Sequence, residues 1–284
     1  MIFYHCLGRL PFALIYPLAW VTYLLLYYVS GYRKAVVMDN LASAFHDKSE
    51  TEITLLAKKF YRQLAEVGLE ITRARYMSRE AFQRRVDILN PDLLISCSGD
   101  MSQTVIILTI HQGNWEWMLH GISASMGVSV DPVYKPLHSP TADRFMRDVR
   151  GRFGANPLPL KLAPREIMRS KKEPRLLAMV ADQAPIRRER SYWTHFLNRE
   201  AAFYPGAERI ARSVGCPILF AQCRRVRQGY YQIEFHQLAD PPYASQEGTI
   251  TERYVKLAEQ AIREQPESWL WSNRRWKRRN DKGG

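Results

Sequence analysis

The sequence lacks the short motifs that mark several large enzyme classes. It contains no P-loop, no G-x-G-x-x-G dinucleotide motif and no set of residues with the spacing of metal ligands. The G-x-S-x-G nucleophile elbow is also missing, so a serine acyl-enzyme has no support in the sequence. We therefore expect an activity that uses neither a metal ion nor a bound cofactor.

Cysteine is scarce, with four in 284 residues. Cys6, Cys97, Cys216 and Cys223 form neither a C-x-x-C pair nor a zinc-like spacing. We interpret them as reduced, structural thiols in a cytosolic environment. Internal repeats and low-complexity linkers are absent too, and the length suits one large α/β domain without a second core.

Acidic residues are outnumbered, because 28 Asp and Glu stand against 41 Lys and Arg and the net charge is +13. That balance favours an anionic partner, such as nucleic acid, membrane headgroups, phosphorylated substrates or an acidic carrier protein. No recognised nucleic-acid-binding module accompanies the charge. The seven tryptophans instead favour a protein of the membrane interface, so we expect a membrane partner and no nucleic acid.

One long apolar run lies near the N-terminus. Residues 11–29 carry no charge, and as a helix they would extend about 28 Å, close to the hydrocarbon thickness of a bilayer. We predict a membrane anchor within residues 1–33 and a catalytic domain over residues 34–284. The apolar run either spans the bilayer, lies in its interface or packs on the domain. If it spans, the positive charges of Arg33 and Lys34 place the catalytic domain in the cytoplasm.

Hydrophobic periodicity predicts strands and helices in alternation. We expect helices at residues 35–45, 50–76, 115–126, 141–153, 163–170, 205–214 and 249–264, and a loop at residues 90–103. We expect strands at residues 105–110, 128–134 and 175–181, and a hairpin of residues 217–223 and 230–236. This order predicts an α/β fold with a largely parallel sheet flanked by helices, whose sites lie at the carboxyl ends of the strands.

His111 stands at the carboxyl end of the strand at residues 105–110, just before a glycine turn and the next helix. Glu116, in the first turn of that helix, would fix the imidazole tautomer and stabilise the protonated ring, as a general base for a hydroxyl requires. The spacing alone is weak, because three histidines have an acid five residues later: His111, His138 and His195. Only His111 combines strand, glycine turn and helix start. The alternative is a strand-end histidine satisfied by the backbone.

Other polar residues are weaker candidates. Arg144, Arg147 and Arg150 recur every three residues on a predicted helix, where they form either a stripe for phosphate or carboxylate recognition or a solvated face. Asp182 and Gln183 follow an apolar strand, at a position that normally faces a cleft unless the pair only caps a turn.

Two basic clusters, at residues 187–190 and 274–279, are typical of solvated surface. In a membrane-bound protein such clusters also attract anionic headgroups. Residues 269–277 interleave tryptophans with cations, a pattern that favours a membrane interface or cation–π packing over base stacking.

Four segments, taken in order, resemble the late acyltransferases of lipid A biosynthesis, the lauroyl/myristoyl transferase family. They are H-Q-G-N-W-E at 111–116, D-Q at 182–183, A-F-Y-P-G-A-E-R-I-A-R-S-V-G-C-P-I-L at 202–219 and P-E-S-W-L-W-S-N-R-R-W-K at 266–277. The N-terminal apolar run and D-N-L-A-S-A-F at 39–45 are also similar, so the likeness covers nearly the whole chain. The histidine–acid box is shared with the wider glycerol-phosphate acyltransferase superfamily and implies that fold.

The resemblance implies an enzyme anchored in the inner membrane, with its catalytic domain on the cytoplasmic side. It would move an acyl chain from an acyl carrier protein thioester to a hydroxyl of an anionic glycolipid, the lipid A precursor. His111 matches the general base of the family and Glu116 its orienting acid. Arg150, Asp182 and Gln183 match further family positions, and we expect these three residues to bind substrate. The chain departs from the family pattern at two places that bear on the acceptor: residues 196–198, usually two aromatics and a small residue, and Asn273, where a histidine is usual nearby.

Our mechanistic hypothesis is direct transfer. His111 takes the proton of the acceptor hydroxyl, Glu116 holds the ring, and backbone N–H groups of Gly113, Asn114 and Trp115 bind the oxyanion at the helix start. Two alternatives stay open. One is the same chemistry on another lipid, such as a phosphatidylinositol mannoside or an aminolipid. The other is a non-enzymatic membrane-bound protein that binds lipid or nucleic acid.

Overall fold

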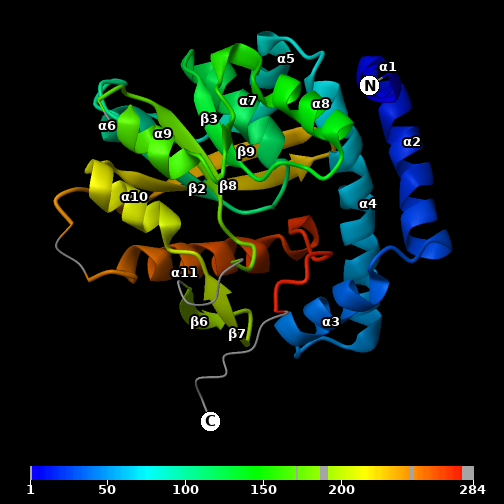
Figure 1. The fold of residues 1–284 in the computed structure, drawn as a ribbon. Helices are drawn as coiled ribbons and strands as arrows, with labels where there is room; N and C mark the ends of the chain where they lie inside the picture. Colours follow the sequence, from blue (N-terminus) through cyan, green and yellow to red (C-terminus); the bar gives the residue numbers. More distant parts are fainter. Residues whose placement is uncertain (1, 171, 186–190, 244–245, 277–284) are drawn as a thin grey trace.

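A computed structural model describes residues 2–170, 172–185, 191–243 and 246–276. At its centre lies a seven-stranded sheet in the order β1-β9-β8-β2-β5-β3-β4 (Figure 1). Its strands are Val86–Ile88 (β1), Val105–Thr109 (β2), Val130–Tyr134 (β3), Leu158–Pro159 (β4), Leu176–Val180 (β5), Ile218–Arg227 (β8) and Tyr230–Ala239 (β9). Neighbouring strands are parallel except in the β8–β9 hairpin. The predicted α/β fold with a largely parallel sheet is confirmed.

Helices cover both faces of this sheet (Figure 1). They are Lys34–Ala44 (α3), Glu50–Ala74 (α4), Arg79–Gln83 (α5), Pro91–Cys97 (α6), Trp115–Met126 (α7), Pro140–Arg150 (α8), Ala163–Arg169 (α9), Gly206–Val214 (α10) and Thr249–Glu264 (α11), with 3-10 turns at Arg152–Gly154 and Pro266–Ser268. Side chains of a strand alternate between the two faces of the sheet. Because helices cover both faces, all five residues of β2 are buried. Ile106 and Leu108 enter the core that contains α11, and Val105 and Ile107 enter the core that contains α7.

The N-terminal apolar run is helical and packs along α4. It consists of Phe12–Leu24 (α2) continued by a π-helical turn at Leu25–Val29, and it follows a short helix, Ile2–Arg9 (α1). Figure 1 shows α1 and α2 at the right of the molecule, beside α4. The stretch of residues 12–29 is long and apolar enough to cross a membrane, and only 17% of it is buried inside the protein. The structure thus has one N-terminal apolar helix suited to a membrane anchor, while the domain boundary at residue 33 stays a prediction.

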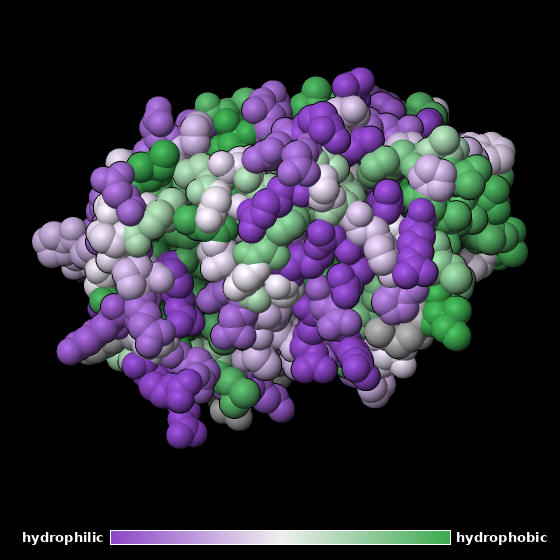
Figure 2. All heavy atoms as spheres, turned by 90° about the horizontal axis from the view of Figure 1, so that it is seen from above, coloured by the Kyte–Doolittle hydropathy of each residue, from purple (hydrophilic) through white to green (hydrophobic). Residues whose placement is uncertain are grey.

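The outer face of these first helices is strongly apolar. Figure 2 shows apolar side chains gathered at the right edge of the molecule, the side on which α1 and α2 lie in Figure 1. The exposed large apolar residues there are Ile2, Phe3, Leu14, Trp20, Val21, Leu25, Tyr28, Val29 and Tyr32. An exposed apolar patch of this kind marks a contact with a membrane or with a partner protein.

Several short elements were missed by sequence pattern. The loop expected at residues 90–103 contains α6, a seven-residue helix that is too short to show periodicity, although Pro91 stands at its first turn. The segment around His195 forms an antiparallel hairpin of Tyr192–Phe196 (β6) and Arg199–Phe203 (β7). Its turn residues, Leu197 and Asn198, both have positive φ without a glycine, so the usual hairpin signal is absent from the sequence.

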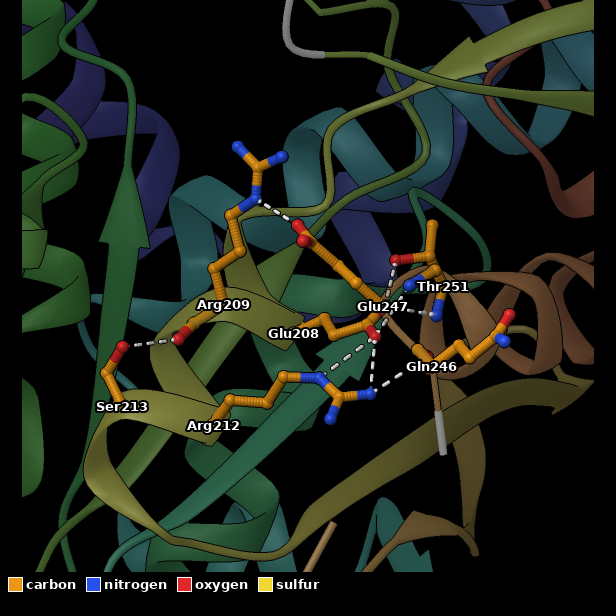
Figure 3. A network of polar contacts seen from close by, with 8 residues as sticks. Glu208, Arg209, Arg212, Ser213, Gln246, Glu247 and Thr251 are labelled. Atoms are coloured by element: carbon orange, nitrogen blue, oxygen red, sulfur yellow. Dashed lines mark hydrogen bonds and ion pairs between the residues drawn. The ribbon is translucent and has the colours of Figure 1, made fainter. Parts of the chain in front are cut away.

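A buried carboxylate fixes α11 against α10 (Figure 3). Glu208 accepts hydrogen bonds from the backbone N–H groups of Gly248 and Thr251, from the Thr251 hydroxyl and from Arg212. These bonds satisfy donors at the start of α11 that have no partner within the helix. The far part of α11 then contributes to the site, because the Ala261 carbonyl accepts a hydrogen bond from the Gln112 side chain at 2.7 Å.

Candidate active site

The carboxyl ends of β2 and β5 bring His111 and Asp182 together. The two strands are parallel neighbours, and Thr109 lies opposite Val180. Residues two positions beyond each strand therefore lie side by side, although they are 71 residues apart in the chain. The distance between His111 Nδ1 and Asp182 Oδ1 is 2.6 Å, which is a strong hydrogen bond between a ring nitrogen and a carboxylate.

Asp182 is held by three donors and is 2% exposed. Its Oδ2 accepts hydrogen bonds from the His111 backbone N–H at 3.2 Å and from the Trp269 indole N–H at 2.7 Å. Burial alone would raise the pKa of this carboxyl, but the neighbouring His111 charge and the hydrogen bonds outweigh it, so its pKa lies below the usual value. The carboxyl group is therefore ionised at neutral pH.

An ionised carboxylate only accepts hydrogen bonds, so it determines the tautomer of His111. Nδ1 carries the proton and donates a hydrogen bond to Asp182. The lone pair of Nε2 then lies on the opposite side of the ring. The Nε2 atom lies 3.3 Å from the side-chain amide nitrogen of Gln183, which is exposed. The imidazole is thus oriented as a general base, with its basic nitrogen toward the surface.

Glu116, the acid expected to hold His111, is hydrogen-bonded elsewhere. Arg150 donates to its carboxylate from Nη2 at 2.5 Å and from Nε at 3.0 and 3.2 Å. Burial raises the pKa of Glu116, but the Arg150 charge and hydrogen bonds outweigh it and lower the pKa below the usual value. The predicted Glu116–His111 hydrogen bond is thus replaced by a His111–Asp182 bond, because the nearest carboxylate comes from the neighbouring strand rather than from the following helix.

Arg150, for which we expected a role in substrate binding, has an internal ion-pair partner in Glu116. Its side chain is 15% exposed, and the guanidinium lies over the ring of Tyr134. Arg144 and Arg147 are exposed, and Arg147 pairs with Asp143 one turn earlier. The solvated alternative therefore holds for these two arginines, while recognition of substrate by Arg150 stays a prediction.

The turn after β2 is packed tightly against the rest of the protein. Gly113 has φ +59°, and a Cβ there would lie 2.5 Å from the Cys223 carbonyl oxygen, so only glycine fits. The Gly113 N–H donates to the Ser268 carbonyl at 3.2 Å. Its predicted role in binding an oxyanion is therefore opposed by an internal hydrogen bond. The ring centroid of Trp115, which is partly exposed, lies 5.0 Å from that of His111 in an edge-to-face arrangement.

Asn114 connects this turn to a buried acid. Its side-chain oxygen accepts from the Trp117 N–H and caps α7, and its amide donates to Glu70 at 3.0 Å. Glu70 also accepts hydrogen bonds from the hydroxyls of Tyr231 and Tyr16. Burial raises the pKa of Glu70 above its usual value, although the bonds from Tyr231 and Asn114 favour the ionised form. Asn114 is thus a structural cap that links the turn after β2 to α4 and, through Tyr16, to α2.

The C-terminal segment completes the site, although its sequence pattern predicted a membrane interface, cation–π packing or a solvated surface rather than a contact with His111 or Asp182. Trp269 bonds to Asp182, and the Leu270 N–H donates to the His111 carbonyl at 3.0 Å. Arg275, expected on a solvated surface, is 2% exposed, lies over the Phe203 ring at 4.2 Å and donates to a backbone carbonyl. Residues 187–190 and 277–279 of the basic clusters lie outside the described residues.

An open pocket of about 320 Å³ lies next to Gln183, the residue whose amide contacts the histidine. It is lined by Tyr32, Arg33, Leu64, Gln183, Leu270, Ser272 and Asn273. Gln183 lines this pocket and also lies 3.3 Å from Nε2 of His111, so its amide connects the pocket to the histidine. No group of three or more His, Cys, Asp or Glu suited to a metal ion occurs among the residues that the structure describes.

Comparison with known proteins identifies the kind of enzyme that carries this site. The sequence model of the family described as bacterial lipid A biosynthesis acyltransferase matches residues 1–278, nearly the whole chain. No curated protein matches the chain. The protein therefore belongs to the bacterial lipid A biosynthesis acyltransferase family.

Proposed function

We propose that this protein transfers a fatty acyl chain from an acyl carrier protein thioester to a hydroxyl group of a lipid A precursor, with His111 as general base and Asp182 as its orienting acid. The observation that carries the proposal is the 2.6 Å bond between His111 and Asp182, which leaves the opposite ring nitrogen 3.3 Å from Gln183, a residue that also lines an open pocket. Family membership supports acyl transfer in lipid A biosynthesis. The donor and the residue roles are our own assignment.

The reaction is a direct transfer between the two substrates. Nε2 of His111 takes the proton of the acceptor hydroxyl while the hydroxyl oxygen attacks the thioester carbonyl carbon. A carbon–oxygen bond forms, and the carbonyl oxygen becomes an oxyanion. Asp182 stabilises the imidazolium that results. The carbon–sulfur bond then breaks, the ester product forms, and the imidazolium returns its proton to the leaving sulfur, so the enzyme ends unchanged.

The oxyanion is stabilised at the N-terminus of α7. The N–H of Trp115, in the first position of that helix, has no acceptor within the helix, and the helix dipole adds partial positive charge there. The amide of Gln183 is a second donor, because it lies 3.3 Å from the reactive nitrogen. Removal of one oxyanion donor typically lowers kcat by about 10²–10³-fold.

The setting of the reaction follows from charge and hydropathy. The apolar face of α1 and α2 anchors the protein in the cytoplasmic membrane, with the catalytic domain on the cytoplasmic side, where it meets the carrier protein. The net charge of +13 attracts both an acidic carrier protein and an anionic glycolipid, so association slows as the salt concentration rises.

The test is acyl transfer by purified full-length protein from acyl carrier protein to a lipid A precursor. Loss of a general base costs about 10²–10⁴-fold in rate, so His111→Ala should lose transfer by that factor while the protein stays folded and membrane-associated. Near-normal transfer by folded His111→Ala protein would refute the mechanism. A mass-spectrometric comparison of lipids from cells with and without the protein identifies the acceptor, and acylation of a different lipid would refute the lipid A assignment.

A further inference from the structure

The open pocket beside Gln183 forms where three parts of the chain meet. Tyr32 and Arg33 come from the turn after the apolar N-terminal helix, and Leu64 comes from α4. Gln183 follows β5, and the remaining residues belong to the C-terminal segment. The pocket therefore lies between the end of the N-terminal apolar helix and the segments that contact His111, which contain Gln183 and Leu270.

The chemical character of the pocket suits an anion. Its lining contains one cation, Arg33, and no acid among the described residues. Tyr32, Gln183, Ser272 and Asn273 add hydroxyl and amide groups, which bind oxygen-rich ligands. The guanidinium group presents a planar fork of donors that matches phosphate oxygens. Its Nη1 donates to the Ser272 carbonyl at 2.9 Å, which directs the group toward this wall of the pocket.

The side of the pocket formed by residues 270–273 is held in place by hydrogen bonds within the protein. The side-chain amide of Asn40, on α3, donates to the carbonyls of Trp271 and Asn273 at 2.8 and 2.9 Å. Arg33 itself adopts φ 51°, a left-handed conformation that is uncommon for a residue other than glycine. Strain of this kind persists only where the surroundings impose it, and it clusters at ligand sites. A preformed wall lowers the entropy that binding has to overcome.

The position of the pocket next to the apolar N-terminal helix favours a lipid headgroup as the bound anion. Arg33 lies four residues after Val29, where the apolar stretch ends, so a helix embedded in the membrane would hold the guanidinium at the depth of the lipid headgroups. The same pocket reaches His111 through the amide of Gln183. We propose that it binds the phosphate-bearing headgroup of the acceptor lipid and presents the acceptor hydroxyl to His111, an inference that rests on the proposed acyl transfer.

The experiment measures steady-state kinetics of the full-length protein with an acyl carrier protein donor. The acceptor is a phosphorylated lipid A precursor or the same lipid after phosphatase treatment. Arg33→Ala should raise KM for the phosphorylated acceptor about ten- to a hundredfold, the usual effect of a hydrogen bond to a charged group. KM for the donor and kcat should change little. Arg33→Lys keeps the charge and should restore part of the affinity, and Asn273→Asp, which adds an acid to the lining, should raise the acceptor KM.

Two controls separate the headgroup pocket from general effects. Arg165→Ala removes an exposed cation on α9, which Figure 1 shows on the side of the molecule away from α4, and should leave both KM values unchanged. With the dephosphorylated acceptor, Arg33→Ala should have no further effect. An unchanged acceptor KM, or an effect that persists without phosphate, would overturn the proposal. A rise in the donor KM alone would assign Arg33 to the phosphate of the carrier protein's prosthetic arm and would equally overturn it.

A binding measurement keeps this test independent of turnover. His111→Ala protein in detergent is titrated with the phosphorylated acceptor, with and without the Arg33→Ala change. Weaker binding of the double variant supports the pocket even if the wild-type protein transfers no acyl group, a result that would refute the proposed function alone. Equal binding by the two proteins would refute the pocket while leaving acyl transfer by wild-type protein unaffected.

Discussion

The indole N–H of Trp269 donates to Oδ2 of Asp182 at 2.7 Å, while the other oxygen of the same carboxylate holds the His111 ring. One oxygen of the carboxylate thus contacts the C-terminal segment, and the other contacts the loop that carries His111. A charge buried this deeply needs such donors, because desolvation without them would favour its neutral form. Trp269 therefore acts on the histidine through Asp182, as a positioning residue.

The role of Asp182 is tested by Asp182→Asn. The variant removes the negative charge and leaves an amide that can donate to Nδ1, which favours the wrong imidazole tautomer. We expect acyl transfer at neutral pH to fall by about 10²–10⁴-fold, with the circular dichroism spectrum unchanged. Glu116→Gln, measured in parallel, should reduce transfer far less when assayed as folded protein. The reverse ranking would return the orienting role to Glu116.

The positioning role of Trp269 is tested by Trp269→Phe, which keeps an aromatic ring and removes the indole N–H. A hydrogen bond to a charged group contributes roughly 1.5–3 kcal/mol, so kcat should fall about tenfold or more. The lost donor helps hold the pKa of Asp182 below its usual value, so the pKa of this carboxyl should rise in the variant. Trp271→Phe is the matched control, because that indole donates to the Pro266 carbonyl instead. Equal effects of the two changes would contradict the assignment.

Substitutions of Glu116 and Arg150, which form a buried ion pair, should have non-additive effects on the free energy of unfolding. Glu116→Leu or Arg150→Met alone leaves a buried charge without a partner and should lower the free energy of unfolding by about 3–5 kcal/mol. The double variant should lose much less than the sum of the single changes. Denaturant unfolding measures all three. The exposed pair of Arg147 and Asp143 serves as comparison and should contribute no more than about 1 kcal/mol. Additive losses at Glu116 and Arg150 would exclude the coupling.

His120 should make the protein less stable in acid. Burial lowers the pKa of this histidine from 6.5 to about 4 in the folded protein. Between these values the unfolded chain binds more protons than the folded one, so stability falls as the pH drops through that window. The contribution of His120 to this loss is on the order of 3 kcal/mol. His120→Leu should flatten the dependence of unfolding free energy on pH between 7 and 4, relative to wild type.

His138 provides the control for that measurement, because it is exposed on the loop before α8. His138→Leu should leave the pH dependence as it is in the wild-type protein. If His120→Leu and wild-type protein lose stability in parallel on acidification, the prediction that His120 stays neutral in the folded protein is wrong.

Local pattern was sufficient for the elements that lie along one stretch of chain. The apolar run at residues 105–110 predicted β2, and Ser49 with Glu52 forms the capping box that starts α4. The glycine turn after His111 was likewise visible, because positive φ at Gly113 requires that residue type. Such features depend on neighbours in sequence, and the chemistry of each residue type reports them directly.

The partner of His111 depended on tertiary structure. Glu116 is five residues away and was the natural choice by spacing, yet the register of β2 and β5 places Asp182 on the ring, 71 residues distant. The same holds for Arg275, for which the sequence left both a solvated position and cation–π packing open, and whose guanidinium lies buried over the Phe203 ring. By itself the sequence determined the family and the main strands and helices, and it singled out His111 as the candidate general base. Only the packed sheet decided which acid holds the histidine, because strand register and burial arise from contacts between residues far apart in the chain.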